Sequence, residues 1–113
     1  MVEPRHERRQ YFRGKSRPGR VLAVRYRTTL HPAWSAAQTR DIGVGGAFIE
    51  AAEVQPAGTA MTLELTLPGS DEVFTLPAIV RWAREHDGMG VQFVGVDVDI
   101  LLELNDYFSS LTG

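Results

Sequence analysis

Three arginines near the start of the chain have the residue type and spacing to bind an anion. Arg9 and Arg13 are separated by three residues, and Arg8 places a further cation beside Arg9. A guanidinium group forms forked hydrogen bonds to phosphate and stacks on planar rings. The same spacing also relates Arg5 to Arg9, so the arginines alone are equally consistent with a solvated basic tail.

A second group of candidate residues lies further along the chain, at positions 41–46. Asp41 offers a carboxylate that only accepts hydrogen bonds, and Gly46 allows close backbone approach or a positive φ. The glycines at 43, 45 and 46 precede an apolar strand pattern and not a helix, so they do not form a dinucleotide-binding fingerprint. The alternative is structural: Asp41 opens a turn and the glycines form a tight turn or bulge, which is compatible with binding.

The two groups lie on either side of a sharp change in charge. The chain has 113 residues and a formal net charge of −2. Residues 1–40 hold ten basic and two acidic residues, whereas residues 41–113 hold two basic and twelve acidic residues. Such asymmetry often marks an anion-binding segment. The change of sign falls at Asp41, so the arginines belong to the basic part of the chain and the second group opens the acidic part.

The rest of the composition removes several classes of function. The chain has no cysteine, which excludes disulfide scaffolds, zinc ribbons and thiol chemistry. Its three histidines lack metal-ligand spacing, and nucleophile, P-loop and paired-carboxylate motifs are missing, so we expect neither an enzyme nor a metal or cofactor. We also expect no membrane span and no secretory signal, hence a cytoplasmic protein, because no long apolar run occurs.

Apolar periodicity indicates the elements that position these residues. Residues 1–20 are rich in arginine, glycine and proline and hold few large apolar side chains, so we expect a mobile basic arm there. Residues 21–113 are expected to form one domain. Period-two alternation predicts six strands, around residues 22–26, 34–40, 47–49, 61–67, 74–82 and 89–93. In the fifth of these strands, Trp82 falls on the same face as Val80.

Turn signals separate the strands, and the period changes near the C-terminus. A tight hairpin is predicted at Asp87-Gly88, and a turn over residues 41–46. Helical spacing relates Leu101, Leu104, Phe108 and Leu111. Asp97 or Asp99 can cap the start of this helix, and Gly113 lies past its end. The predicted fold class is all-β: a six-stranded antiparallel barrel with a flexible basic N-terminal arm and one C-terminal α-helix.

The order of these features resembles the PilZ domain. The first motif of that family is Arg-x-x-x-Arg, which Arg9 and Arg13 match. Its second motif is Asp/Asn-x-Ser-x-x-Gly, which Asp41 and Gly46 match, while Gly43 replaces the serine. The family's size, six-stranded barrel and C-terminal helix are similar to the fold predicted above, so the resemblance covers nearly the whole chain.

The resemblance implies a non-enzymatic bacterial receptor for the second messenger cyclic di-GMP. This ligand has two phosphates and two guanines, which suit Arg9 and Arg13, and Asp41 can accept from a guanine edge. Arg8 would favour an intercalated ligand dimer. One missing hydroxyl at Gly43 is expected to weaken affinity roughly twofold to tenfold. Closure of the arm over the ligand would then change the surface offered to a protein partner.

Two other functions remain open at this stage. A divergent PilZ-like adaptor would act by protein–protein contacts with weak or no cyclic di-GMP binding, and Gly43 makes this plausible. General nucleic-acid binding would use the basic arm, with Tyr11 and Phe12 as stacking residues. The acidic second half of the chain argues against a long nucleic-acid track, so we expect no general nucleic-acid binding.

Overall fold

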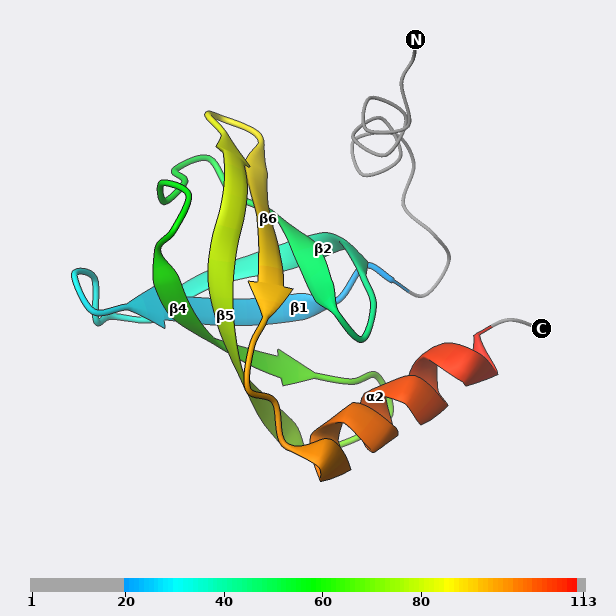
Figure 1. Cartoon of the computed structure of the whole chain (residues 1–113). Coiled ribbons are helices and arrows are strands. Elements are labelled where there is room, and N and C mark those ends of the chain that lie inside the picture. Colours follow the sequence, from blue (N-terminus) through cyan, green and yellow to red (C-terminus); the bar gives the residue numbers. More distant parts are fainter. Residues whose placement is uncertain (1–19, 112–113) are drawn as a thin grey trace, which may run out of the picture.

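The fold is given by a computed structural model that describes residues 20–111. Of the arm predicted over residues 1–20, only Arg20 is described; the predictions for Arg8, Arg9 and Arg13, and that for Gly113, lie outside the described residues. The elements are β1 Ala23–Thr28, β2 Ser35–Ile42, β3 Gly46–Glu50, β4 Ala60–Thr66, β5 Val73–Arg84, β6 Gly88–Phe93 and α2 Val98–Ser110 (Figure 1).

The six strands close into a barrel in the order β1-β2-β3-β6-β5-β4, and every neighbouring pair is antiparallel. This confirms the predicted six-stranded antiparallel barrel with a C-terminal helix. Alternation places one face of each strand in the core; in β4, for example, Met61, Leu63 and Leu65 are buried. Closure of the barrel leaves no open sheet edge.

Helix α2 packs one apolar stripe on the barrel core. Leu104 and Phe108 are buried and belong to the core cluster. Of the two predicted caps, Asp97 is the N-cap: its side chain accepts a hydrogen bond of 2.9 Å from the backbone N–H of Asp99. Figure 1 shows α2 lying across one end of the barrel, away from the β5–β6 turn.

A buried threonine fixes the point where the chain enters the barrel. Thr39 is fully buried, and its hydroxyl accepts a 2.8 Å hydrogen bond from the N–H of Leu22 and donates one of 2.8 Å to the carbonyl of Arg20. The Arg20 guanidinium donates to the carbonyl of Ile42 at 2.7 Å and lies 4.5 Å from the ring centroid of Phe108. The entering chain is therefore tied to the end of β2 and to α2.

The β5–β6 hairpin forms where it was predicted but uses other residues in its turn. Residues 85–87 form the turn, and His86 takes the left-handed conformation with φ 65°. Gly88 is already the first residue of β6. A Cβ at Gly88 would collide with the carbonyl of Ile49 and the ring of Phe48, so this glycine serves strand packing and not turn geometry.

Replacement of Thr39 by valine tests the anchor at the chain entry. Thr39→Val keeps the shape of the side chain but leaves the Leu22 N–H and the Arg20 carbonyl without their hydroxyl partner. We expect a loss of about 1–3 kcal/mol in the free energy of unfolding, measured by urea denaturation. The matched control is Thr75→Val at an exposed position of β5, which should change stability by less than about 0.5 kcal/mol. Equal effects of both substitutions would contradict the anchor.

Candidate functional site

Four residues on four adjacent strands form one row across the outer face of the barrel. Asp41 of β2 pairs with Phe48 of β3, Phe48 with Gly90 of β6, and Gly90 with Trp82 of β5. The next row along the strands includes Ala47 and Val91, which belong to the core cluster. Because successive residues point to opposite faces, the row from Asp41 to Trp82 faces outward.

Two register shifts place the ends of this row. One lies between Thr39 and Asp41 in β2, and the other between Val80 and Trp82 in β5. A β-bulge adds one residue to a strand and redirects the side chains that follow it. Val80 is fully buried, whereas Trp82 is partly exposed on the outer face. The prediction that Trp82 shares the face of Val80 was therefore wrong.

Glycines in β6 make room for an aromatic layer on this outer face. The rings of Phe48 and Trp82 have centroids 5.2 Å apart at an interplanar angle of 32°. A Cβ on Gly90 would collide with the indole of Trp82, as one on Gly88 would with Phe48. The layer explains how Phe48 is fully buried although it is not part of the contiguous core cluster inside the barrel.

A charged cluster holds the far side of this layer. The Arg40 guanidinium lies 4.6 Å from the Phe48 ring centroid and donates to Glu50 at 2.8 Å and to Asp87 at 2.7 Å. The hydrogen bond from Arg40 lowers the pKa of Glu50. Burial acts to lower the pKa of Arg40, but its hydrogen bonds to Asp87 and Glu50 outweigh this and raise it. Arg40 is thus held by two carboxylates as part of the scaffold.

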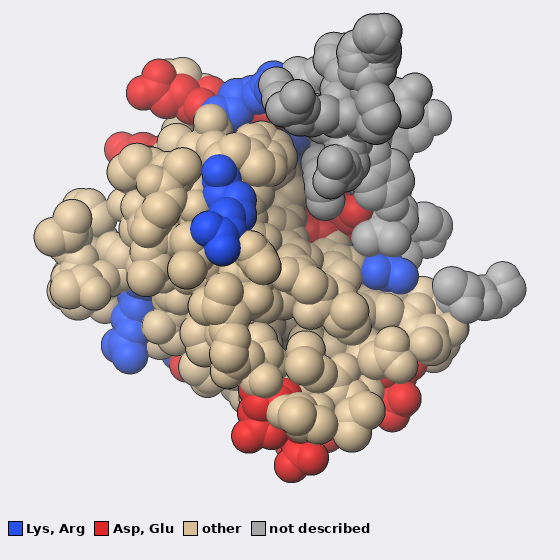
Figure 2. Space-filling model, viewed as in Figure 1, with Lys and Arg blue, Asp and Glu red and all other residues tan. Residues whose placement is uncertain are grey.

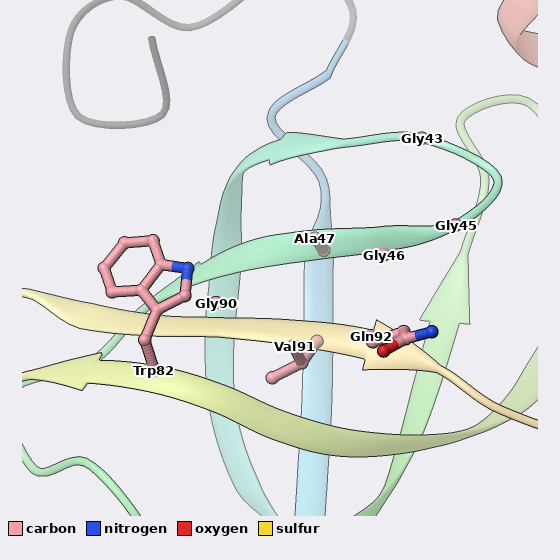
Figure 3. Close-up of a pocket in the computed structure, with 8 residues that line it drawn as sticks. All are labelled: Gly43, Gly45, Gly46, Ala47, Trp82, Gly90, Val91 and Gln92. Atoms are coloured by element: carbon pink, nitrogen blue, oxygen red, sulfur yellow. The ribbon is translucent and has the colours of Figure 1, made fainter. Parts of the chain in front are cut away.

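A hollow of about 320 Å³ lies beside the aromatic layer. Trp82 stands at one end and Gln92 at the other, with Gly90 and Gly46 between them (Figure 3). The side-chain amide oxygen of Gln92 accepts a 2.7 Å hydrogen bond from Arg81. A flat indole in the same hollow as the partly exposed backbone of Gly43 and Gly46 suits a planar heterocycle, which can stack on the ring and approach the main chain closely.

The structure places two of the predicted second-motif residues, Gly43 and Gly46, at this hollow, whereas Asp41 is not among the residues that line it. Asp41 and Ile42 belong to β2 and Gly46 begins β3, so the turn is shorter than the predicted 41–46. Gly43 and Gly46 line the hollow, and the N–H of Gly43 donates to the carbonyl of Gly46 at 2.9 Å. Asp41 lies in the outer row and is only 2% exposed.

The two motif glycines differ in what the backbone requires of them. A Cβ on Gly46 would collide with the carbonyl of Val91, so close packing of β3 on β6 needs glycine there. The space around a Cβ on Gly43 is open within 4 Å. A serine would therefore be accommodated at Gly43, and glycine at that position is not imposed by packing.

Sequence reasoning missed Trp82, Gly90 and Gln92 as residues of the hollow. The available signal was the pair of glycines at positions 88 and 90 within a strand pattern, since glycine inside a strand often marks a close approach. Within residues 20–111, no cluster of three or more acidic or histidine side chains is placed to hold a metal ion.

The barrel, its C-terminal helix and the motif residues at the β2–β3 turn define a PilZ-type domain. Residues 7–110 match the PilZ domain family, and the chain belongs to this family. PilZ domains act as non-enzymatic receptor and adaptor domains, and cyclic di-GMP is the ligand of the receptors among them. No curated protein sequence matches the chain.

Two solved structures are similar to the fold. One is the Bacillus subtilis inhibitor of motility MotI/DgrA, with a TM-score of 0.68 and 18% identity over 86% of this chain; the chain spans only 49% of that protein. The other is the PilZ domain of CeSA from a cellulose-synthesizing bacterium, with a TM-score of 0.61 and 17% identity over 84% of this chain and 96% of that one. Within residues 20–111, no helix is both long enough and apolar enough to cross a membrane.

The packing of Trp82 over Gly90 is testable by a matched pair of glycine substitutions. Gly90→Ala places a methyl group into the indole, and we expect the domain to lose about 1–3 kcal/mol of stability from overpacking. In a Trp34→Phe background, the fluorescence of Trp82 should shift to the red as the ring moves into solvent. Gly43→Ala, which has open space, should leave both stability and spectrum close to those of the parent. Identical behaviour of the two variants would contradict this packing.

Proposed function

We propose that this chain is a non-enzymatic receptor for cyclic di-GMP, which binds on the outer face formed by β2, β3, β6 and β5. The observation that carries the proposal is the position of Gly43 and Gly46, two residues of the second motif, on the rim of a hollow that ends at Trp82. A family motif, a planar aromatic surface and exposed backbone thus occur together. A guanine base can stack on the aromatic ring and approach the glycine backbone closely.

The outer row provides complementary groups for a guanine base. Stacking of a base on an aromatic side chain contributes about 1–3 kcal/mol, and the Trp82 indole is the surface for it. The carboxylate of Asp41 suits the N1–H and N2–H donors of guanine. Asp41 already takes part in an interaction within the chain, so a guanine would bind by exchanging with that interaction.

The anchored chain entry supports a role for Arg9 and Arg13 at the same face. Arg20 is bonded to the carbonyl of Ile42, the last residue of β2 before the glycine turn. Arg13 lies seven positions before Arg20, and a chain of that length spans at most about 25 Å. In this proposal Arg9 and Arg13, aided by Arg8, bind the phosphates and guanines of a ligand that lies on the outer face of the barrel. Ligand binding would thereby reorganise the surface beside β2 and α2 for a protein partner.

A divergent adaptor is the second candidate function. Gly43 replaces the serine of the motif although the surrounding space would admit one. In addition, one similar structure is that of an inhibitor of motility. An adaptor of this kind would act by protein–protein contacts with weak or no cyclic di-GMP binding.

Calorimetric titration of the full chain with cyclic di-GMP tests the receptor proposal. Arg9→Ala and Arg13→Ala should each weaken binding by about tenfold or more, because each removes a charge-assisted hydrogen bond. Asp41→Ala should also weaken binding, whereas Asp41→Asn should retain more affinity because the motif admits either residue.

The matched control is Arg25→Ala on β1, whose side chain pairs with Glu64 at 2.6 Å and stacks on Trp34. It should leave affinity unchanged. Absence of heat at high micromolar nucleotide, with a folded sample by circular dichroism, would reject the receptor proposal and favour the adaptor.

Gly43→Ser separates a weakened receptor from an adaptor that has lost the site. The new hydroxyl restores the motif in open space, and we expect cyclic di-GMP to bind roughly twofold to tenfold more tightly. Gly43→Ala is the control for the change in backbone entropy and should not reproduce the gain. A serine variant that binds no better than the alanine variant would show that this position contributes nothing to affinity.

A further inference from the structure

Helix α2 presents a ridge of apolar and acidic side chains to solvent. Val98 and Leu102 are one turn apart and are 66% and 57% exposed. Asp99, Glu103 and Asp106 form the adjoining stripe at helical spacing. Figure 2 shows acidic side chains along the edge where Figure 1 places α2. We call these five residues the α2 ridge.

The charges of the ridge are not balanced locally. Among residues 20–111, none of the ion pairs involves Asp99, Glu103 or Asp106. The last turn of α2 holds no basic residue. A cation near this end would interact favourably with the helix dipole, whereas the negative charge of Asp106 interacts unfavourably with it. The ridge therefore combines exposed apolar area with uncompensated negative charge.

A groove of about 420 Å³ lies close to the start of this helix, on the outer face of β1, β4 and β5. Its apolar lining includes Pro32, Met61, Pro77, Ile79 and Val94. Its one charged lining residue is Arg27, whose guanidinium lies 4.6 Å from the Trp34 ring centroid.

Arg27 differs from its neighbour on the same face of β1. Arg25 is paired with Glu64 at 2.6 Å, whereas no carboxylate within residues 20–111 forms an ion pair with Arg27. Arginine and tryptophan are the residues most enriched at the energetic centres of protein interfaces. The groove thus offers one available cation beside an apolar depression.

We propose that the α2 ridge of one copy docks in the groove of a second copy. The charges are opposite, and each surface also presents apolar side chains; the groove adds the hydroxyl groups of Thr28, Thr29 and Thr62. Val94 lines the groove and Val98 begins the ridge only four residues later, so the two surfaces adjoin on every copy. A two-fold axis can then place each ridge in the other copy's groove, which closes the assembly as a dimer.

In this dimer Val98 and Leu102 cover the apolar lining, and Glu103 or Asp99 pairs with Arg27. One helical face and one groove form a small interface, of the class that buries less than about 1,200 Å² and is weak and transient. Association is therefore expected at micromolar or higher concentration and should weaken as salt is raised. The contact uses none of the residues that line the hollow at Trp82, so the dimer is expected to form without nucleotide.

Sedimentation velocity of the full chain, without nucleotide, tests the dimer by charge reversal. The native chain should pass from monomer to dimer as its concentration rises. Arg27→Glu and Glu103→Arg should each weaken association by about tenfold or more, since each places like charges together. The double variant restores an opposite pair and should recover most of the association.

Two further variants complete the design. Glu85→Arg reverses a charge in the β5–β6 turn, at the other end of the barrel from α2 in Figure 1, and should dimerise like the native chain. Leu102→Ser removes apolar contact without a change in charge and should weaken the dimer. Circular dichroism confirms that each variant is folded. A native chain that stays monomeric at millimolar concentration, or a double variant no better than the single ones, would overturn the proposal.

Discussion

The two β-bulges are the constraint on which the candidate site depends. Without the extra residue after Val80, strict alternation would turn Trp82 toward the core, and the outer face would lack its aromatic end. The bulge before Asp41 acts in the same way on β2 and brings its carboxylate into line with Phe48. Both bulges therefore serve one row of residues. Gly90 completes this row, because only a residue without a Cβ lets the indole lie across β6.

The site and the chain entry are coupled through β2. Thr39 binds the backbone of Arg20 and Leu22, and the Arg20 side chain binds the carbonyl of Ile42. A segment that emerges from Arg20 starts next to the turn that holds Gly43. Residues that are about 20 positions apart in the sequence are thereby held together by short hydrogen bonds that are buried or partly buried.

Period-two alternation and turn chemistry were sufficient to predict six strands, an antiparallel barrel and the amphipathic helix, but not the order of the strands around the barrel. They failed at Trp82 because a bulge breaks the period without any change in residue type, and at Asp87-Gly88 because His86 takes the left-handed position that glycine usually occupies. Asp41, Gly43 and Gly46 were proposed from their motif order, and the structure places Gly43 and Gly46 at the hollow. Gln92 carries no comparable signal, since its place in the hollow follows only from its pairing with Gly46 across β3 and β6.

The hollow and the groove meet along one strand pair. Gln92 lines the hollow and Ile79 lines the groove, and these two residues are paired across β6 and β5. A ligand that pressed on Gln92 would act on the strand that forms one wall of the groove, and Arg81, which binds Gln92, belongs to that strand as well. Any coupling between nucleotide and self-association would then pass through β5. It would need no movement of α2 relative to the core, because Leu104 and Phe108 hold that helix from the opposite side of its ridge.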